Sequence, residues 1–145
     1  MNGGPSEPAV LAVVDTGPLY AVADADDDDH DRCLAVLQRT DLDLVVPAMV
    51  VAEATYLIGS RMGAVAEAAF LNALASFEIE SPTAEDWPAM AALVNRYADF
   101  PLGGTDASVA VLADRLRADV IVTLDRRHFG ALRSPSGTPY ELLPD

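Results

Sequence analysis

The sequence predicts a three-layer α/β domain with a mainly parallel sheet. Two short apolar runs rich in valine, at residues 9–14 and 120–124, are typical of strands buried on both faces of a sheet. Longer segments with apolar residues at helical spacing separate the expected strands, so that strands and helices alternate along the chain. The chain has 145 residues, of which 51% are apolar and 22% charged, as expected for one globular domain.

Each expected element follows from its own stretch of sequence. Residues 1–8 are rich in glycine and proline and predict a mobile tail, which leaves residues 9–145 as a single domain. Six aspartates between Asp24 and Asp31 require solvent and predict a loop. Further strands are expected at residues 44–46, 77–80 and 140–143. Helices are expected at residues 18–23, 30–39, 47–58, 63–77, 83–97 and 105–118.

The composition excludes several classes of function. All nine basic residues are arginine, which excludes Schiff-base chemistry, the phosphate-binding P-loop and lysine-dependent phosphoaspartate switches. The single cysteine, Cys33, cannot form an internal disulfide or a cysteine-rich zinc site, and we expect a reducing cytoplasm. The longest apolar run, residues 44–52, is far shorter than the roughly 18 residues needed to cross a bilayer, so no membrane location is expected.

Two aspartates follow the most apolar strands directly. Asp15 ends the run LAVVD, and Asp125 ends the run VIVTLD. Ligands of open parallel sheets bind beyond the carboxyl ends of the strands, where both aspartates are expected to lie. The alternative for each is that it starts a turn or caps the next helix. Their occurrence together on two buried strands favours a functional site.

Glu53 is the only residue charged at neutral pH between Leu44 and Ser60. Because its predicted helix is otherwise apolar, we expect protein to surround that helix almost completely. A carboxylate buried there without partners would be costly, which favours a role as a cation ligand. The alternative is that Glu53 lies on a narrow stripe facing solvent.

Asp106 belongs to the segment GGTDAS, in the first turn of a predicted helix, where backbone N–H groups favour negative charge. Taken alone, it is explained by an ordinary helix start. Taken with Asp15, Glu53 and Asp125, it predicts a pocket of four carboxylates. Such an all-oxygen set suits Mg²⁺ or Mn²⁺ rather than zinc.

These segments carry a resemblance to a known family. DTGPL, VVAE, GGTDASVAVLADRL and VTLDRRHF, in this order, resemble the PIN-domain ribonucleases, and in particular the VapC toxins of bacterial VapBC toxin–antitoxin pairs. The resemblance covers the chain from about Val13 onward. It implies a three-layer α/β/α PIN-like domain that cuts RNA with Mg²⁺ or Mn²⁺. Gly17 departs from the DTS form that is commoner in the family, and it removes no metal ligand.

The resemblance also implies roles for particular residues. It places Asp15, Glu53, Asp106 and Asp125 at the acidic quartet that holds the metal and performs catalysis. Three threonines are expected to support these acids: Thr16 beside Asp15, Thr105 beside Asp106, and Thr123, which would orient Asp125. A VapB-like antitoxin partner and a homodimer are further expectations that come from the family.

The distribution of charge bears on RNA binding. The net charge is −14, but residues 94–145 hold six of the nine arginines and are nearly neutral. Arg126 and Arg127, directly after Asp125, are the best candidates for contacts to RNA phosphates. The alternative is that these arginines are ordinary surface residues, paired with Asp114 and Asp119. His128 is interpreted as a packing or helix-capping residue, with contact to substrate as the alternative, and Trp87 as a core residue.

Two other functions stay open at this point. Asp15 could act as the nucleophile of a phosphatase or phosphotransferase, although Gly17 stands where a second acid would be needed. A catalytically inactive PIN-like interaction module is the other alternative. The presence of all four acids argues against it.

Overall fold

A computed structural model describes residues 8–145 and contains one five-stranded sheet. All of the strand pairs are parallel, and the strand order is β3-β2-β1-β4-β5. The α/β class and the parallel sheet predicted from the sequence are thus confirmed. The expected tail at residues 1–8 lies, apart from Pro8, outside the described residues. The strands are β1 (Val10–Val14), β2 (Leu42–Pro47), β3 (Glu78–Glu80), β4 (Val120–Val122) and β5 (Glu141–Leu143).

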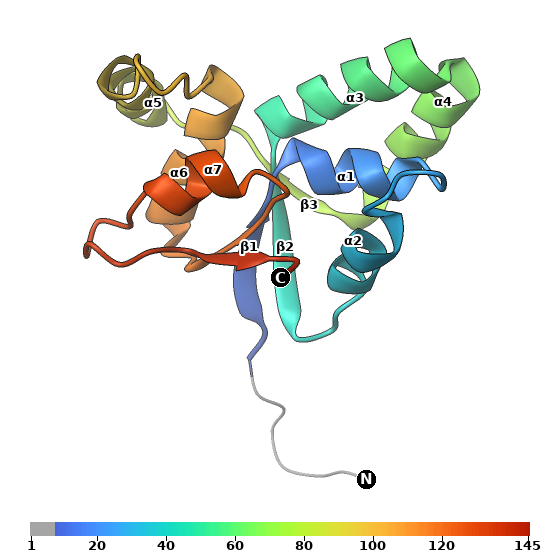
Figure 1. Cartoon of the computed structure of the whole chain (residues 1–145), viewed down its shortest axis with the longest axis horizontal. Coiled ribbons are helices and arrows are strands. Elements are labelled where there is room, and N and C mark those ends of the chain that lie inside the picture. Colours follow the sequence, from blue (N-terminus) through green and yellow to red (C-terminus); the bar gives the residue numbers. More distant parts are fainter. Residues whose placement is uncertain (1–7) are drawn as a thin grey trace, which may run out of the picture.

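Helices lie on both sides of the central strands, as Figure 1 shows. On one side, α1 packs against α2 and α3, and α3 packs against α4. On the other side, α6 packs against β1, β2 and β4, and α5 covers α6. The helices are α1 (Thr16–Ala23), α2 (His30–Leu37), α3 (Ala48–Met62), α4 (Ala64–Ala73), α5 (Asp86–Arg96), α6 (Gly104–Leu116) and α7 (Arg126–Ala131), with a short 3₁₀ turn, η1 (Leu74–Ser76), after α4.

The core is formed where α6 and the α1–α3 layer meet the sheet. Among its largest fully buried side chains are Ile58 of α3, Ile121 of β4 and Phe129 of α7. The middle strands β1 and β4 end in fully buried valines, which explains why their sequences are continuous apolar runs. Within the described part of the chain, no helix is both long and apolar enough to cross a membrane.

Several boundaries differ from the prediction, and one helix was not predicted. The helix expected at residues 63–77 ends at Ala73, and the strand expected at residues 120–124 ends at Val122. Helix α3 continues through Gly59 to Met62, and its C-cap is Gly63, whose positive φ of 90° is a conformation that glycine adopts without strain. Helix α7 was not predicted, because its six residues are too few to show a helical period. This short helix matters to the site, since Asp125 is its N-cap residue.

Candidate active site

The carboxyl ends of β1 and β4 lie side by side and bring their aspartates to one edge of the sheet. Val14 pairs with Val122, and the N–H of Asp15 donates to the carbonyl of Val122 at 2.9 Å. An open pocket of about 370 Å³ lies at this edge. Its lining includes all four predicted acids, together with two residues from the start of α1, one from α3 and one from the loop after β4: Asp15, Thr16, Gly17, Glu53, Leu57, Asp106, Leu124 and Asp125.

Asp15 is buried, with 6% of its surface exposed, and Thr123 holds its carboxylate. The Thr123 hydroxyl donates to Asp15 Oδ2 at 2.8 Å and accepts the N–H of Asp125 at 2.9 Å. Although Asp15 occupies the N-cap position of α1, its side chain makes no capping hydrogen bond. Helix capping therefore does not explain this carboxylate. The sequence predicted that Thr123 orients Asp125. In the structure the Thr123 hydroxyl contacts only the backbone of Asp125, and the side chain that it holds is that of Asp15.

Burial, with smaller contributions from the negative charges of Asp106 and Glu53, raises the pKa of Asp15 to about 6, although hydrogen bonds from the Thr123 hydroxyl and the Thr16 backbone oppose the shift. Burial also raises the pKa of Asp106, with contributions from Asp125 and Glu53 in the same direction. These carboxylates are therefore close enough to repel one another. A bound cation would relieve this repulsion.

Glu53 does not lie in the surroundings that its sequence predicted. It is exposed, as is Tyr56 one turn later, so the expectation that protein surrounds α3 is wrong. One side of α3 packs on the core through Val50, Ala54 and Ile58, and its other side is open to solvent. Glu53 still faces the acidic pocket, so its solvent-facing position is compatible with a role as a ligand.

Asp106 is the third residue of α6, after the N-cap Gly103. Its Oδ2 lies 3.4 Å from the N–H of Gly103, a long hydrogen bond that uses one oxygen for capping. No hydrogen bond joins the Thr105 hydroxyl to Asp106 among the described residues; the carbonyl of Thr105 accepts from Ser108 instead. The Thr105 hydroxyl therefore does not support Asp106 by a hydrogen bond among the described residues, although the sequence predicted such support.

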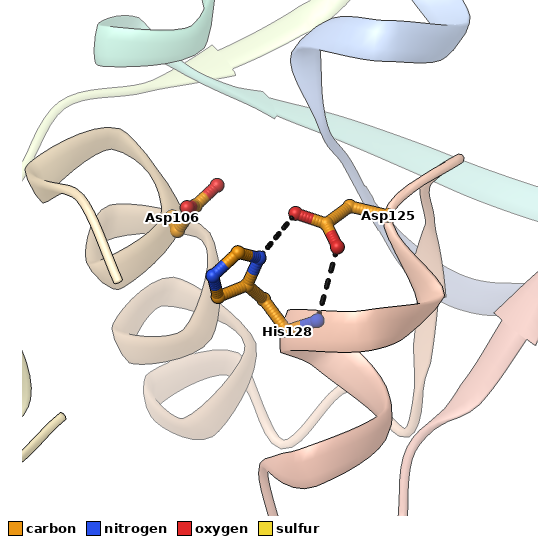
Figure 2. A group of neighbouring side chains, drawn as sticks. All are labelled: Asp106, Asp125 and His128. Carbon is orange, nitrogen blue, oxygen red and sulfur yellow. Dashed lines mark hydrogen bonds and ion pairs between the residues drawn. The ribbon is translucent and has the colours of Figure 1, made fainter. Parts of the chain in front are cut away.

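His128 joins this group, and sequence reasoning did not single it out as a site residue. Its Nδ1 lies 2.8 Å from Asp125 Oδ2, and its backbone N–H donates to Asp125 Oδ1 at 3.0 Å (Figure 2). Asp106, Asp125 and His128 each offer a potential ligand atom, and these atoms lie within 4.8 Å of one another. The signal in the sequence was the three-residue spacing between Asp125 and His128, which is one helical turn.

A divalent metal fits this pocket on two observations. The four carboxylates form the oxygen-rich donor set that hard cations prefer. In addition, Thr16 is 5% exposed, and its Oγ1 is buried without a hydrogen-bond partner in the described residues. A buried hydroxyl without a partner is unfavourable, and a ligand or its water shell in the pocket would satisfy it.

Three of the C-terminal arginines already have partners within the chain: Arg115, Arg126 and Arg133. Arg126 Nη2 donates to the carbonyl of Leu142 at 3.1 Å and to that of Pro144 at 2.6 Å, which ties α7 to the chain end. Arg115 pairs with Asp86 and Glu80, not with Asp114 or Asp119 as the alternative interpretation held. Arg127 is different, because its exposed guanidinium lies 4.8 Å above the ring of Phe100.

Replacing Asp15 by asparagine should stabilise the metal-free protein, and increasingly so as the pH rises from about 4 to 6. The unfolded carboxyl ionises near 3.8, whereas the folded one keeps its proton up to about 6. Between these values the folded state binds more protons, so the wild type loses up to about 3 kcal/mol as the pH rises. Urea unfolding of both proteins in chelator from pH 4 to 8 measures the difference. A difference that does not vary with pH would contradict the prediction.

Comparisons with known proteins identify the family of this chain. Residues 12–133 match the PIN domain family. The chain is 40% identical to ribonuclease VapC26 of Mycobacterium tuberculosis over 91% of its own length and 99% of that protein. The crystal structure of VapC20 from the same organism, a toxin that cleaves the sarcin–ricin loop, is similar with a TM-score of 0.71 and 19% identity, over 76% of this chain and 86% of that one.

A second solved structure is similar over nearly the whole chain. It is VapBC2 of Rickettsia felis bound to a promoter DNA fragment, with a TM-score of 0.67 and 18% identity, over 92% of this chain and 97% of the other. At these identities the two structures support the fold. The family match and the 40% identical relative go further, and the chain belongs to the PIN-domain family and, within it, to the VapC ribonucleases.

Proposed function

We propose that this protein is a metal-dependent endoribonuclease and the toxin of a toxin–antitoxin pair. The observation that carries the proposal is the pocket itself: Asp15, Glu53, Asp106 and Asp125 come from four separate elements and line one cavity. The 40% identity to a VapC ribonuclease supports the same activity. An aspartate-nucleophile phosphotransferase is disfavoured by the family and by Gly17, and an inactive interaction module by the complete set of acids.

The four carboxylates would hold Mg²⁺ or Mn²⁺. When bound, such a cation activates a water molecule and neutralises charge on the phosphodiester. The chain contributes a rigid frame for this chemistry: Thr123 fixes Asp15, and α7 fixes Asp125. Glu53, open to solvent and with no hydrogen bond to its carboxylate among the described residues, can adjust to the ion or to substrate water.

RNA would approach the pocket past Arg127 rather than along a broad basic surface. Arg127 follows Asp125 by two residues and is exposed. Arg126 donates to backbone carbonyls, so its main effect should be on the fold of the C-terminal segment. We therefore assign the main contact to RNA phosphate to Arg127, and we expect a weaker contribution to RNA binding from Arg126.

An antitoxin segment would fit a second, apolar pocket. This pocket of about 300 Å³ lies between α1, α2 and α4. It is lined by Leu19, Val22, Ala23, Leu37, Ala69, Phe70, Ala73, Leu74 and Phe77. The aspartate-rich segment 24–29 follows Ala23 directly, so an amphipathic partner with basic residues beside its apolar stripe would match both the groove and its charge.

A homodimer, expected from the family, stays a prediction. Trp87 of α5 is 51% exposed, so its interpretation as a core residue is wrong. Together with Val94 and Met49, it lines a groove of about 540 Å³ that contains no charged side chain. Exposed apolar side chains grouped in this way mark contact surfaces, and we expect a second copy to cover this face of α5.

Cleavage of RNA should stop when EDTA removes divalent metal and should return when Mg²⁺ or Mn²⁺ is added.

Asp106→Asn should abolish RNA cleavage while leaving the metal-free melting temperature equal or higher, because one repelling charge is lost and a capping oxygen is kept. The rise in melting temperature on adding metal should shrink. Asp99→Asn, an exposed acid outside the pocket, is the matched control and should behave as wild type. An Asp106→Asn protein that is less stable yet still cuts RNA would exclude Asp106 as a ligand.

Arg127→Ala should weaken RNA binding and lower the slope of log affinity against log salt by about one, as loss of one phosphate contact requires. Arg126→Ala should change that slope less and should lower the free energy of unfolding by about 1 kcal/mol, because its carbonyl contacts are lost. Arg39→Ala, which removes an arginine paired with Asp41 before β2, is the control. Binding is measured on catalytically inactive Asp106→Asn protein, and equal slopes for all variants would refute the assignment.

Ala69→Asp should weaken antitoxin binding at least tenfold, because it places a charge in the apolar groove. Ala68→Asp, next to it on α4 and also exposed but outside the groove, should bind the antitoxin as wild type does. Calorimetric titration with the antitoxin measures both. Equal losses for the two variants would indicate that the groove is not the docking site.

A further inference from the structure

His128 engages both oxygens of Asp125. Its backbone N–H donates to Oδ1 at 3.0 Å, and its ring Nδ1 lies 2.8 Å from Oδ2 (Figure 2). An ionised carboxylate only accepts hydrogen bonds, so Nδ1 must carry a proton and donate it to Oδ2. The backbone bond alone would cap α7 and hold one oxygen. The imidazole bond is needed to fix the rotation of the carboxylate about its own axis.

The imidazole is itself held in place. Its ring packs against Phe100 with a centroid distance of 4.7 Å, and the guanidinium of Arg127 lies 4.8 Å over that same Phe100 ring. The His128 side chain is 17% exposed, and its Nε2 is buried without a hydrogen-bond partner among the described residues. This packing makes His128 a rigid donor to Asp125.

We propose that His128 is a positioning residue that acts through Asp125. It holds the Asp125 carboxylate in the orientation in which that carboxylate and Asp106 share one pocket. The inference rests on the proposed metal-dependent function. Hydrogen bonds to metal-binding carboxylates orient them before the ion arrives, and losing such a partner commonly costs 10–100-fold in metal affinity.

Direct ligation by His128 is the competing interpretation, because its ring lies in the same cluster as Asp106 and Asp125. The geometry favours positioning. Nδ1 is turned to Asp125, and a metal there would have to replace that hydrogen bond. Nε2 is buried, whereas the pocket that holds the four acids is open and does not include His128 in its lining.

The test compares Mn²⁺ binding by the full chain without RNA, measured from free Mn²⁺ by electron paramagnetic resonance. In His128→Asn the side-chain amide can donate from near the Nδ1 position, whereas in His128→Gln the amide lies near the Nε2 position. We expect His128→Asn to keep the wild-type Kd within about threefold, and His128→Gln and His128→Ala to raise it tenfold or more.

Equal Kd values for wild type and all three variants would overturn the inference alone. An equal loss in His128→Asn and His128→Ala would overturn it in favour of direct ligation. Absence of Mn²⁺ binding in the wild type would overturn the proposed function and the inference with it.

A measurement on the wild type keeps the inference testable if a variant does not fold. Nitrogen-15 spectra of the His128 ring should show a protonated Nδ1. Adding Mg²⁺ should leave the Nε2 signal at its position. A large Mg²⁺-induced shift of Nε2 would refute positioning, and so would a ring protonated only at Nε2.

Discussion

The hydroxyl of Thr123 joins the two aspartates that follow β1 and β4, and the arrangement of the pocket depends on it. The hydroxyl is fully buried, donates to the Asp15 carboxylate and accepts the backbone N–H of Asp125. The two strands pair in register just before this point, so the hydroxyl spans a gap that the sheet itself has already set. Without this bond, a buried Asp15 would lack its side-chain partner, and a charge buried without a partner destabilises a fold strongly.

The pocket nevertheless holds more negative charge than these hydrogen bonds can stabilise. Burial raises the pKa of both Asp15 and Asp106, and neighbouring carboxylates add to each shift. Two like charges about 4 Å apart repel by roughly 4 kcal/mol at an effective dielectric near 20. This repulsion between the carboxylates destabilises the folded protein, and a cation bound in the pocket would relieve it. This conflict between stability and binding is typical of functional sites.

Much of this site follows from sequence because parallel strands impose their geometry. Two apolar runs that end in aspartate must place both carboxylates at one edge of a parallel sheet, as Asp15 and Asp125 do. Residues on helix surfaces were harder to place. The sequence around Glu53 and around Trp87 indicated that each lies on a buried helix face, yet both side chains are exposed. Hydropathy does not reveal which face of a helix another element covers. For His128 the sequence indicated packing or helix capping, but not its bond to the Asp125 side chain, because that bond depends on a helix of six residues.

The contacts of the C-terminal arginines bear on how an acidic chain would bind RNA under the proposed function. Residues 94–145 are nearly neutral, but Arg115 forms ion pairs, and both Arg126 and Arg133 donate to backbone carbonyls. These three arginines therefore make contacts within the fold rather than forming a basic surface. Under the proposed function, a metal ion held by the four carboxylates would supply much of the attraction for RNA, and Arg127 would add a contact beside the pocket. Binding of substrate and of metal would then be coupled, because an empty pocket of carboxylates repels the phosphates that a loaded pocket attracts.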